Sequence, residues 1–464
     1  MRKIIIYLLI AVTFVTIIFC INAIKNTAYQ QIAAMPTKQD GDESHAKTGY
    51  EFTTHLPLVV IETGGQQIKK DSLIWAEISI IDNVKGENRQ GEAPDLSAPA
   101  VIKYRGSSSY YSFDKKQYRI EFREKYGEEK NADYEVMGMS AASDWVLNGP
   151  FLDRTLIRNH MVLAISRKLL SWAPDSCYCE IILDGEYLGV YVMIEPITKE
   201  KNGRLNLTNF GLVSGTTAYI VKRERSNTEE NVIETYGSLN GLTSYELSIS
   251  YPKARNLTKK QFEWIKNDIS EFERVLYSER FDDPDLGYAA YIDVDNFIDY
   301  YIINELTLTT DAGYLSTYAY KDIGEKLKLT VWDFDNTFNN YVSVKSVDKF
   351  YVASSNWFSR LFEDRSFVDA VVIRYKELRE GKLSQENLLG LVDENVAYLG
   401  NGIDRNFKIW GYTFFEKLLA HNEDGSHRDP KSYEEAIDQL KECIVARGKF
   451  LDENIEMLYQ YCIN

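Results

Sequence analysis

The stretch Tyr301–Asn340, YIINELTLTTDAGYLSTYAYKDIGEKLKLTVWDFDNTFNN, decides the fold of this chain and the place of its chemistry. Its apolar start predicts the end of a helix over Phe297–Leu308. Two alternating runs follow, Ser316–Lys321 and Lys326–Trp332, and a polar turn containing glycine joins them. This pattern is typical of a β-hairpin.

Three carboxylates surround the predicted hairpin. Asp311 precedes its first strand, and Asp333 and Asp335 follow its second. If the fold gathers them, each raises the pKa of the others, and a hard divalent cation with oxygen ligands is the natural counter-ion. Aspartate is also common as a helix cap and in turns, so the pattern alone leaves a purely structural role open.

Composition sets limits on the class of protein. The 464 residues exceed the usual size of a single core, about 250–300 residues, and predict two lobes or domains. A hydrophobic content of 44% and a charged content of 26% are those of a globular chain. The net charge of −16 argues against nucleic acid as a partner, because phosphate binding requires a basic surface.

The amino terminus predicts export. Arg2 and Lys3 precede an apolar run, Ile4–Ile21, that is long enough to span a bilayer. The basic flank predicts a cytoplasmic amino end and an exported body. Ile21-Asn22-Ala23 is a poor cleavage site, which favours an uncleaved anchor over a cleaved signal peptide. Residues 1–24 are therefore an anchor or signal peptide, and 25–50 a polar tether.

The remaining chain predicts an α+β fold in two parts. Residues 51–197 are rich in strand patterns and contain one clear helix, Asp153–Leu170. Residues 198–464 begin with a strand-and-loop insertion, 199–256, and then become helical. The predicted helices are 258–277, 293–308, 357–380, 384–399 and 431–458.

A second candidate site lies in the strand-rich part. Arg105-Gly106-Ser107-Ser108-Ser109 is a turn of small residues, and its backbone amides could meet an anion. The strand that follows begins with Lys115 and Lys116. The arrangement suits phosphate binding, and a solvated hairpin fits the spacing equally well.

Eight segments together resemble the spore coat protein H (CotH) kinase family over residues 56–460. They are LPLVVIETGG, RGSSS with KKQYRIEF, WVLNGPFLDRTLIRN, EYLGVYVMIEPI, NELTLTTD, YAYKD, WDFDNTF and ECIVARGKFLDENI. The resemblance implies a bilobal, protein-kinase-like fold. Its N-lobe would be β-rich with one main helix, and its larger helical C-lobe would carry the metal-site hairpin.

The resemblance also implies roles for residues. Asp311 matches the catalytic-loop acid, and Asp333 and Asp335 match the metal-binding acids. ATP with Mg²⁺ or Mn²⁺ would bind between the lobes, with either Lys115 or Lys116 on the phosphates. The implied nucleotide-binding residues are Arg105, Gly106, Ser107, Lys115, Lys116, Asp153, Arg158, Asn159 and Glu195.

Two positions depart from the family pattern. Ser316 stands five residues after Asp311, where a kinase-like catalytic loop often has a metal-binding asparagine. Ser316 would be a weaker metal ligand. Asn339 stands where the family usually has glycine, and asparagine tolerates left-handed backbone angles better than most residues.

The expected function is phosphorylation of Ser or Thr on an exported surface or spore-coat protein. The acidic enzyme would suit a basic acceptor. Three alternatives remain: an inactive kinase-fold protein for adhesion or assembly, a nucleotidyltransferase, and a phosphatase with the Asp-X-Asp-X-Thr motif. In the last, Asp333 would be the nucleophile and Asp335 the acid–base group.

Overall fold

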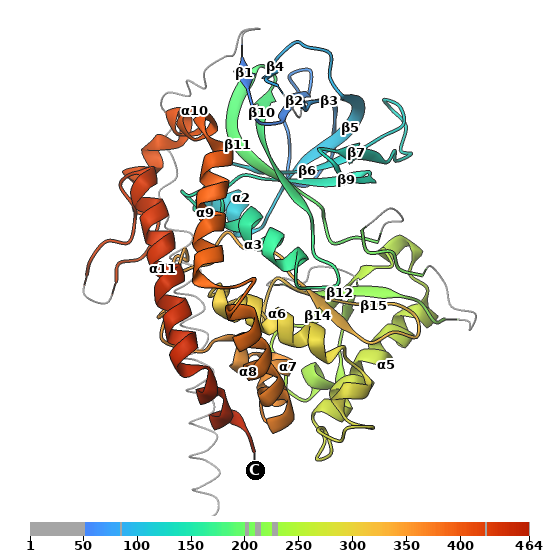
Figure 1. Ribbon diagram of the computed structural model, residues 1–464. Coiled ribbons are helices and arrows are strands. Elements are labelled where there is room, and N and C mark those ends of the chain that lie inside the picture. Colours follow the sequence, from blue (N-terminus) through green and yellow to red (C-terminus); the bar gives the residue numbers. More distant parts are fainter. Residues whose placement is uncertain are drawn as a thin grey trace, which may run out of the picture.

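The computed structural model describes residues 52–83, 86–199, 204–208, 215–224, 231–422 and 425–463. The anchor and tether predicted at 1–24 and 25–50 lie outside these residues. Within the described residues, no helix is both long and apolar enough to cross a membrane. The fold is α+β, as the sequence predicts, with a β-barrel on one side and a helical body with a second sheet on the other (Figure 1).

The strand-rich part closes into a seven-stranded barrel, and the sequence pattern does not reveal this closure. The order is β10-β11-β9-β6-β5-β3-β2, with antiparallel neighbours except for the parallel pair β2 and β10. Closure leaves the barrel sheet without a free edge. The strands are β2 (Leu58–Glu62), β3 (Ile74–Ile81), β5 (Leu96–Arg105), β6 (Gln117–Phe122), β9 (Asp144–Asn148), β10 (Ser176–Leu183) and β11 (Glu186–Ile194).

Strand β6 shows how the alternating pattern builds the barrel. Tyr118, Ile120 and Phe122 are buried in the barrel core, whereas Arg119 and Glu121 point outward and form an ion pair at 2.7 Å. A side-chain period of two residues buries one face of a strand. Short elements beside the barrel are β1 (Thr53–Thr54), β4 (Asn88–Arg89), α2 (Ser108–Ser112), β7 (Tyr134–Val136) and β8 (Met139–Ala142).

The helix of this part, α3 (Arg158–Arg167), is shorter than predicted. The residues before it form a turn around the Asp153 carboxylate. This carboxylate accepts hydrogen bonds from the backbone N–H groups of Thr155 (3.0 Å) and Arg158 (2.9 Å). The turn therefore delays the start of the helix to Arg158.

The predicted hairpin is present as β15 (Thr317–Lys321) and β16 (Lys328–Thr330). It belongs to a five-stranded sheet of order β13-β14-β12-β15-β16. The described parts of the 199–256 stretch supply three of these strands, and β12 lies at the centre. They are β12 (Tyr219–Arg223), β13 (Val232–Ile233) and β14 (Leu247–Tyr251), with the short helix α4 (Tyr236–Leu239) between them.

Most predicted helices of the body are present, with one error and one omission. The single helix predicted over 357–380 is wrong, because the Asp364 carboxylate accepts a hydrogen bond from the Ser366 N–H and begins a new helix. Helix α10 was not predicted. The helices are α5 (Lys259–Leu276), α6 (Val294–Leu306), α7 (Asn356–Leu361), α8 (Arg365–Arg379), α9 (Gln385–Leu399), α10 (Asn401–Trp410) and α11 (Tyr433–Asn454), with 3₁₀ segments at Ala254–Asn256, Tyr288–Ala290, Val352–Ser354, Gly411–Phe414 and Ile455–Tyr461.

A buried ion pair joins the helices that flank the site. Glu305 on α6 and Arg447 on α11 approach to 2.5 Å, and both side chains are almost fully buried. Glu305 also accepts hydrogen bonds from the backbone N–H groups of Tyr351 (2.9 Å) and Val352 (2.8 Å). Arg447 donates to the backbone oxygen of Lys349 (2.7 Å). The pair therefore fixes the segment that follows the acidic motif.

Helix α10 fastens the barrel to the body. The buried Lys115 Nζ donates to Asn406 Oδ1 on α10 (2.8 Å) and to the Val190 oxygen on β11 (2.6 Å). Arg405 pairs with the buried Glu180 carboxylate of β10 at 2.7 Å. The Lys115 and Arg405 side chains therefore secure one helix from the body against the outside of the barrel, beside β11 in Figure 1.

The Glu305–Arg447 pair predicts a large stability effect. Arg447→Met should lower the free energy of unfolding by about 3–5 kcal/mol, because it leaves the Glu305 carboxylate buried without its cation. Urea unfolding followed by circular dichroism measures this. Lys449→Met, on the same helix with a 71% exposed side chain, is the matched control and should change little. Equally small losses of unfolding free energy in both variants would contradict a stabilising role of the Glu305–Arg447 pair.

Candidate functional site

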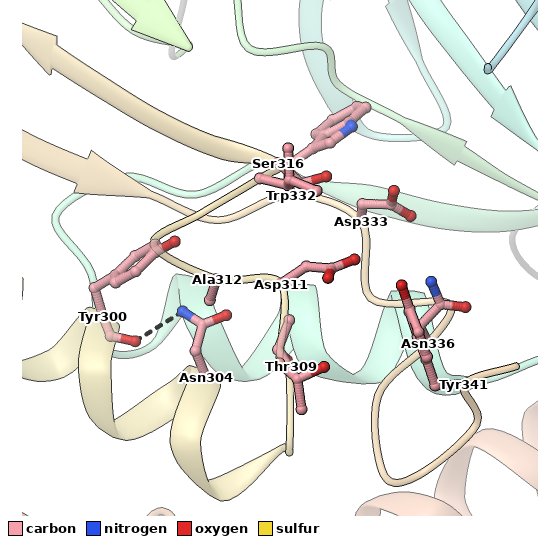
Figure 2. Close-up of a pocket in the computed structure, with 12 residues that line it drawn as sticks. Tyr300, Asn304, Thr309, Asp311, Ala312, Ser316, Trp332, Asp333, Asn336 and Tyr341 are labelled. Carbon is pink, nitrogen blue, oxygen red and sulfur yellow. Dashed lines mark hydrogen bonds between the residues drawn. The ribbon is translucent and has the colours of Figure 1, made fainter. Parts of the chain in front are cut away.

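A cavity of about 220 Å³ lies where the barrel meets the hairpin, and we call it the acidic cavity. Figure 2 shows Asp311, Asp333 and Asn336 pointing into the same space. The structure thus brings together seven residues that the sequence singled out. They are Arg105, Gly106, Ser107, Asp311, Ser316, Asp333 and Asp335.

A tight turn between α6 and β15 presents Asp311. The Asp311 backbone oxygen accepts hydrogen bonds from the N–H groups of Tyr314 (3.0 Å) and Leu315 (2.8 Å). Gly313 has φ +81°, and a Cβ there would lie 1.9 Å from the Ser355 Oγ, so the turn requires glycine. Ser316, with φ 47°, is also left-handed. The carboxylate is therefore held by a strained and well-bonded backbone.

Helix α3 holds the loop that carries the other two acids. Asn159 Oδ1 accepts a hydrogen bond from the Phe334 N–H (3.3 Å), and Arg158 Nε donates to the Thr337 oxygen (3.1 Å). Asp333 has φ 67°, a conformation that few residues other than glycine adopt without strain. The two α3 residues therefore position the acidic loop, and Asn159 also lines a small pocket beside Asp333.

Asp335 lies between the barrel and the body. Its Oδ2 accepts a hydrogen bond from Asn148 Nδ2 on β9 at 3.0 Å. Burial, followed by the charge of Asp333, raises the pKa of Asp335 to about 7. Asp335 Oδ1 and Asn148 Oδ1 are both buried without a hydrogen-bond donor. Two adjacent side chains thus each have an oxygen that a cation would satisfy.

The three acids share a cavity, but they do not form a three-carboxylate cage. Among the described residues, no group of three or more His, Cys, Asp or Glu side chains could together hold a metal ion. The candidate ligands are instead Asp333, Asp335 and the amide oxygen of Asn148. One or two carboxylates with further neutral oxygens are the usual protein contribution to a Mg²⁺ site.

The two predicted lysines are not placed at the cavity. Lys115 is buried against α10, and burial lowers its pKa well below the ordinary value. Lys116 Nζ donates to the backbone oxygens of Tyr110 and Phe113, at 2.7 Å each. Among the residues that the structure describes, the cation that lines the cavity is Arg105, whose Nη1 donates to Gln117 Oε1 (2.8 Å).

Two other predicted nucleotide-binding residues are engaged within the protein. Asp153 forms a buried ion pair with Arg158 at 2.5 Å. Glu195, just after β11, accepts a hydrogen bond from the Asp175 N–H (3.0 Å) and pairs with the buried Arg204 (3.3 Å). Burial raises the pKa of Glu195, and Arg204 opposes this shift. Both acids stabilise the walls of the site rather than face the acidic cavity.

A larger cleft of about 1050 Å³ adjoins the acidic cavity, and we call it the barrel–sheet cleft. Arg105 and Trp332 line both, and the Arg105 guanidinium lies 5.4 Å from the centre of the Trp332 ring. The remaining lining comes from the barrel, from the sheet and from the residues after β11. It includes Val101, Arg119, Val146, Pro196, Ile197, Thr198, Lys222, Ile249 and Lys253.

Several lining residues escaped the sequence interpretation. Asn336, in the acidic cavity, follows the Asp-Phe-Asp motif directly, and Asn148, in the small pocket beside Asp333, ends the quoted WVLN segment, so both had a local signal. Glu224 and Tyr341 had none. Glu224 follows β12, where burial raises its pKa and the charge of Asp333 adds to the shift.

Comparison with known proteins supports the family resemblance found in the sequence. A family model described as CotH kinase protein matches residues 102–451, about three quarters of the chain. The match includes every residue that lines the acidic cavity. No curated protein matches the chain.

The raised pKa of Asp335 predicts pH-dependent stability in the absence of divalent ions. The folded chain holds this proton more tightly than the unfolded chain, so the stabilisation is complete below the ordinary pKa and is lost as pH rises through about 7. Asp335→Asn imitates the protonated acid. It should match the wild type near pH 4 and be more stable near pH 8, as measured by urea unfolding with a chelator.

The control for this measurement is Asp348→Asn, an exposed aspartate in the following segment. It should track the wild type across the whole pH range. A constant difference between Asp335→Asn and wild type at all pH values would contradict the raised pKa.

Proposed function

Since the chain belongs to the CotH kinase family, we propose that it is a phosphotransferase using ATP with Mg²⁺ or Mn²⁺. The acceptors would be Ser or Thr hydroxyls of an exported protein. One observation carries the proposal: Asp311, Asp333 and Asp335 line one cavity together with the Arg105 turn. The overall arrangement would be the bilobal one of protein kinases, with the barrel as N-lobe and the helical body as C-lobe.

Asp311 is the proposed catalytic acid. It is half-buried and lies on a turn that fixes its backbone, opposite the metal-site loop. A carboxylate there can orient the acceptor hydroxyl and take its proton during transfer. Asp311 precedes β15 whereas Asp333 and Asp335 follow β16, so catalysis and metal binding would fall to two different loops.

The metal would be held by Asp333, Asp335 and Asn148. The fit rests on the two buried oxygens without donors, Asp335 Oδ1 and Asn148 Oδ1. A divalent cation there would neutralise phosphate charge and orient the phosphates. Ser316 and Asn336 also line the cavity, and the Asn336 amide could replace the amide that the family pattern places after Asp311.

The nucleotide would extend from the barrel–sheet cleft into the acidic cavity. The residues Pro196–Thr198 after β11 line the cleft, near the place where adenine binds in kinase-like folds. Arg105 stands where the two spaces meet, so its guanidinium can bind phosphate oxygens by charge-assisted hydrogen bonds. The structure supports Arg105 in this role more than Lys115 or Lys116.

The acceptor and the location remain expectations from the sequence. The apolar run Ile4–Ile21 would tether the enzyme to a membrane, and the net charge of −16 would favour a basic acceptor protein over nucleic acid. Asp333 and Asp335 follow an antiparallel hairpin here. This setting differs from the parallel-sheet edge at which α/β folds usually bind phosphorylated ligands. It therefore argues against a phosphatase in which Asp333 is the nucleophile.

The proposal predicts separate effects for the two kinds of acid. Asp333→Ala should abolish Mn²⁺-dependent ATP binding in calorimetric titration, because it removes a metal ligand. Asp311→Asn should keep that binding and lower the rate of phosphate transfer from labelled ATP by about 10²–10⁴-fold, because it removes the proton acceptor.

Asp348→Ala is the matched control for both measurements and should bind and react as the wild type does. If the wild type releases no heat of binding with ATP and either metal, the proposed activity is contradicted. An assembly or adhesion protein with a kinase fold would then be favoured. Transfer of a nucleoside monophosphate, with release of pyrophosphate, would instead identify a nucleotidyltransferase.

A further inference from the structure

The charge of the acidic cavity is poorly balanced by the residues that line it. Asp311, Asp333, Asp335 and Glu224 are acidic, and Arg105 is the cation among the lining residues that the structure describes. A nucleotide adds further negative charge. Charge on the transferred phosphoryl oxygens must be stabilised during the reaction, and this is usually a large contribution to catalysis. Besides the proposed metal ion, a cationic side chain near Asp311 would add to this stabilisation.

Lys345 is placed to supply that charge. Its ammonium lies 4.9 Å from the centre of the Tyr341 ring and 6.0 Å from that of Tyr351. Tyr341 lines the acidic cavity beside Asp311. Burial lowers the pKa of Lys345, and the charge of the Asp311 carboxylate opposes this shift.

The backbone of Lys345 is held in place by the residue that departs from the family pattern. Asn339 has φ 60°, so it takes the left-handed turn expected of glycine. Its Oδ1 accepts a hydrogen bond from the Lys345 N–H (3.1 Å) and another from Arg428 (3.0 Å). Arg428 also donates to the Tyr341 oxygen (3.0 Å). Glycine could make neither side-chain contact, so the asparagine ties the lysine to the acidic loop.

We infer that Lys345 is a further catalytic residue, which contacts the phosphoryl group being transferred on the side of Asp311. This inference rests on the proposed function. In the step, the acceptor oxygen bonds to the terminal phosphorus and gives its proton to Asp311. The bond from phosphorus to the bridging oxygen breaks, and its electron pair leaves with ADP. Lys345 donates hydrogen bonds to the phosphoryl oxygens throughout.

The test compares two nucleotides that differ by the terminal phosphoryl group. Calorimetry with Mn²⁺ measures binding of ADP and of the β,γ-imido analogue of ATP to the full chain. Lys345→Met keeps the apolar stem over the tyrosines and removes the charge. It should weaken binding of the analogue about tenfold or more and leave ADP affinity unchanged, because charge-assisted hydrogen bonds are lost only with the former.

Lys345→Arg should restore most of the preference for the analogue, and Lys349→Met, an exposed lysine on the same segment, should behave as the wild type. Equal affinities of Lys345→Met and wild type for both nucleotides would overturn the inference alone. Equal weakening for both nucleotides would assign Lys345 a structural role and also overturn it. Failure of the wild type to bind either nucleotide would overturn the proposed function and this inference with it.

Discussion

Mutual repulsion among carboxylates is the constraint that the rest of this site must accommodate. Asp311, Asp333 and Asp335 share one cavity, and burial of Asp335 beside Asp333 raises its pKa. Separating the acids would relieve the repulsion, so other contacts must prevent it. Those contacts come from outside the acidic motif: Asn159 and Arg158 of α3 hold the loop through its backbone. The strained φ angle of Asp333 follows from this restraint.

The same constraint explains why the barrel and the body are joined so firmly. The hydrogen bond from Asn148 to Asp335 links a barrel strand to the acidic loop, and its geometry depends on the relative position of the two parts. Helix α10 fixes that position by the buried contact of Lys115 with Asn406 and by the pair of Arg405 with Glu180. A lysine buried for this purpose is unavailable to phosphate. Arg105 is free of that task and lines both spaces of the site.

Local patterns were sufficient to predict the parts of the fold that depend on neighbours in sequence. The hairpin β15–β16, the alternation of β6 and helices α5, α6, α9 and α11 all follow from periodicity or turn residues. Closure of the barrel depends on the parallel pairing of β2 with β10, which lie more than a hundred residues apart, and no local pattern encodes that. Helix α10 was missed although it is the element that holds the barrel.

The site residues that belong to contiguous motifs were predictable from the sequence, whereas contacts between distant residues were not. The three acids, Ser316 and the Arg105 turn could be found because their motifs are contiguous, and the structure places them on one cavity. The direction of Lys115 depends on a partner 291 residues away, and the contact of Asn148 with Asp335 spans 187 residues. Sequence places such residues near a site but does not say which way their side chains point.

The contacts in the site explain the two residues that depart from the family pattern, Ser316 and Asn339. Ser316 removes an amide oxygen from the turn after Asp311. Asn336 of the acidic loop brings an amide to the acidic cavity, and Asn148 of a barrel strand brings one to the small pocket beside Asp333. Asn339 adopts the backbone angle of a glycine and gains hydrogen bonds that glycine could not make. The buried oxygens Asp335 Oδ1 and Asn148 Oδ1 have no hydrogen-bond donor, so they destabilise the fold unless a cation occupies the site. Such oxygens are not expected in a site that no longer binds a cation. The substitutions therefore fit a rearranged site better than an abandoned one.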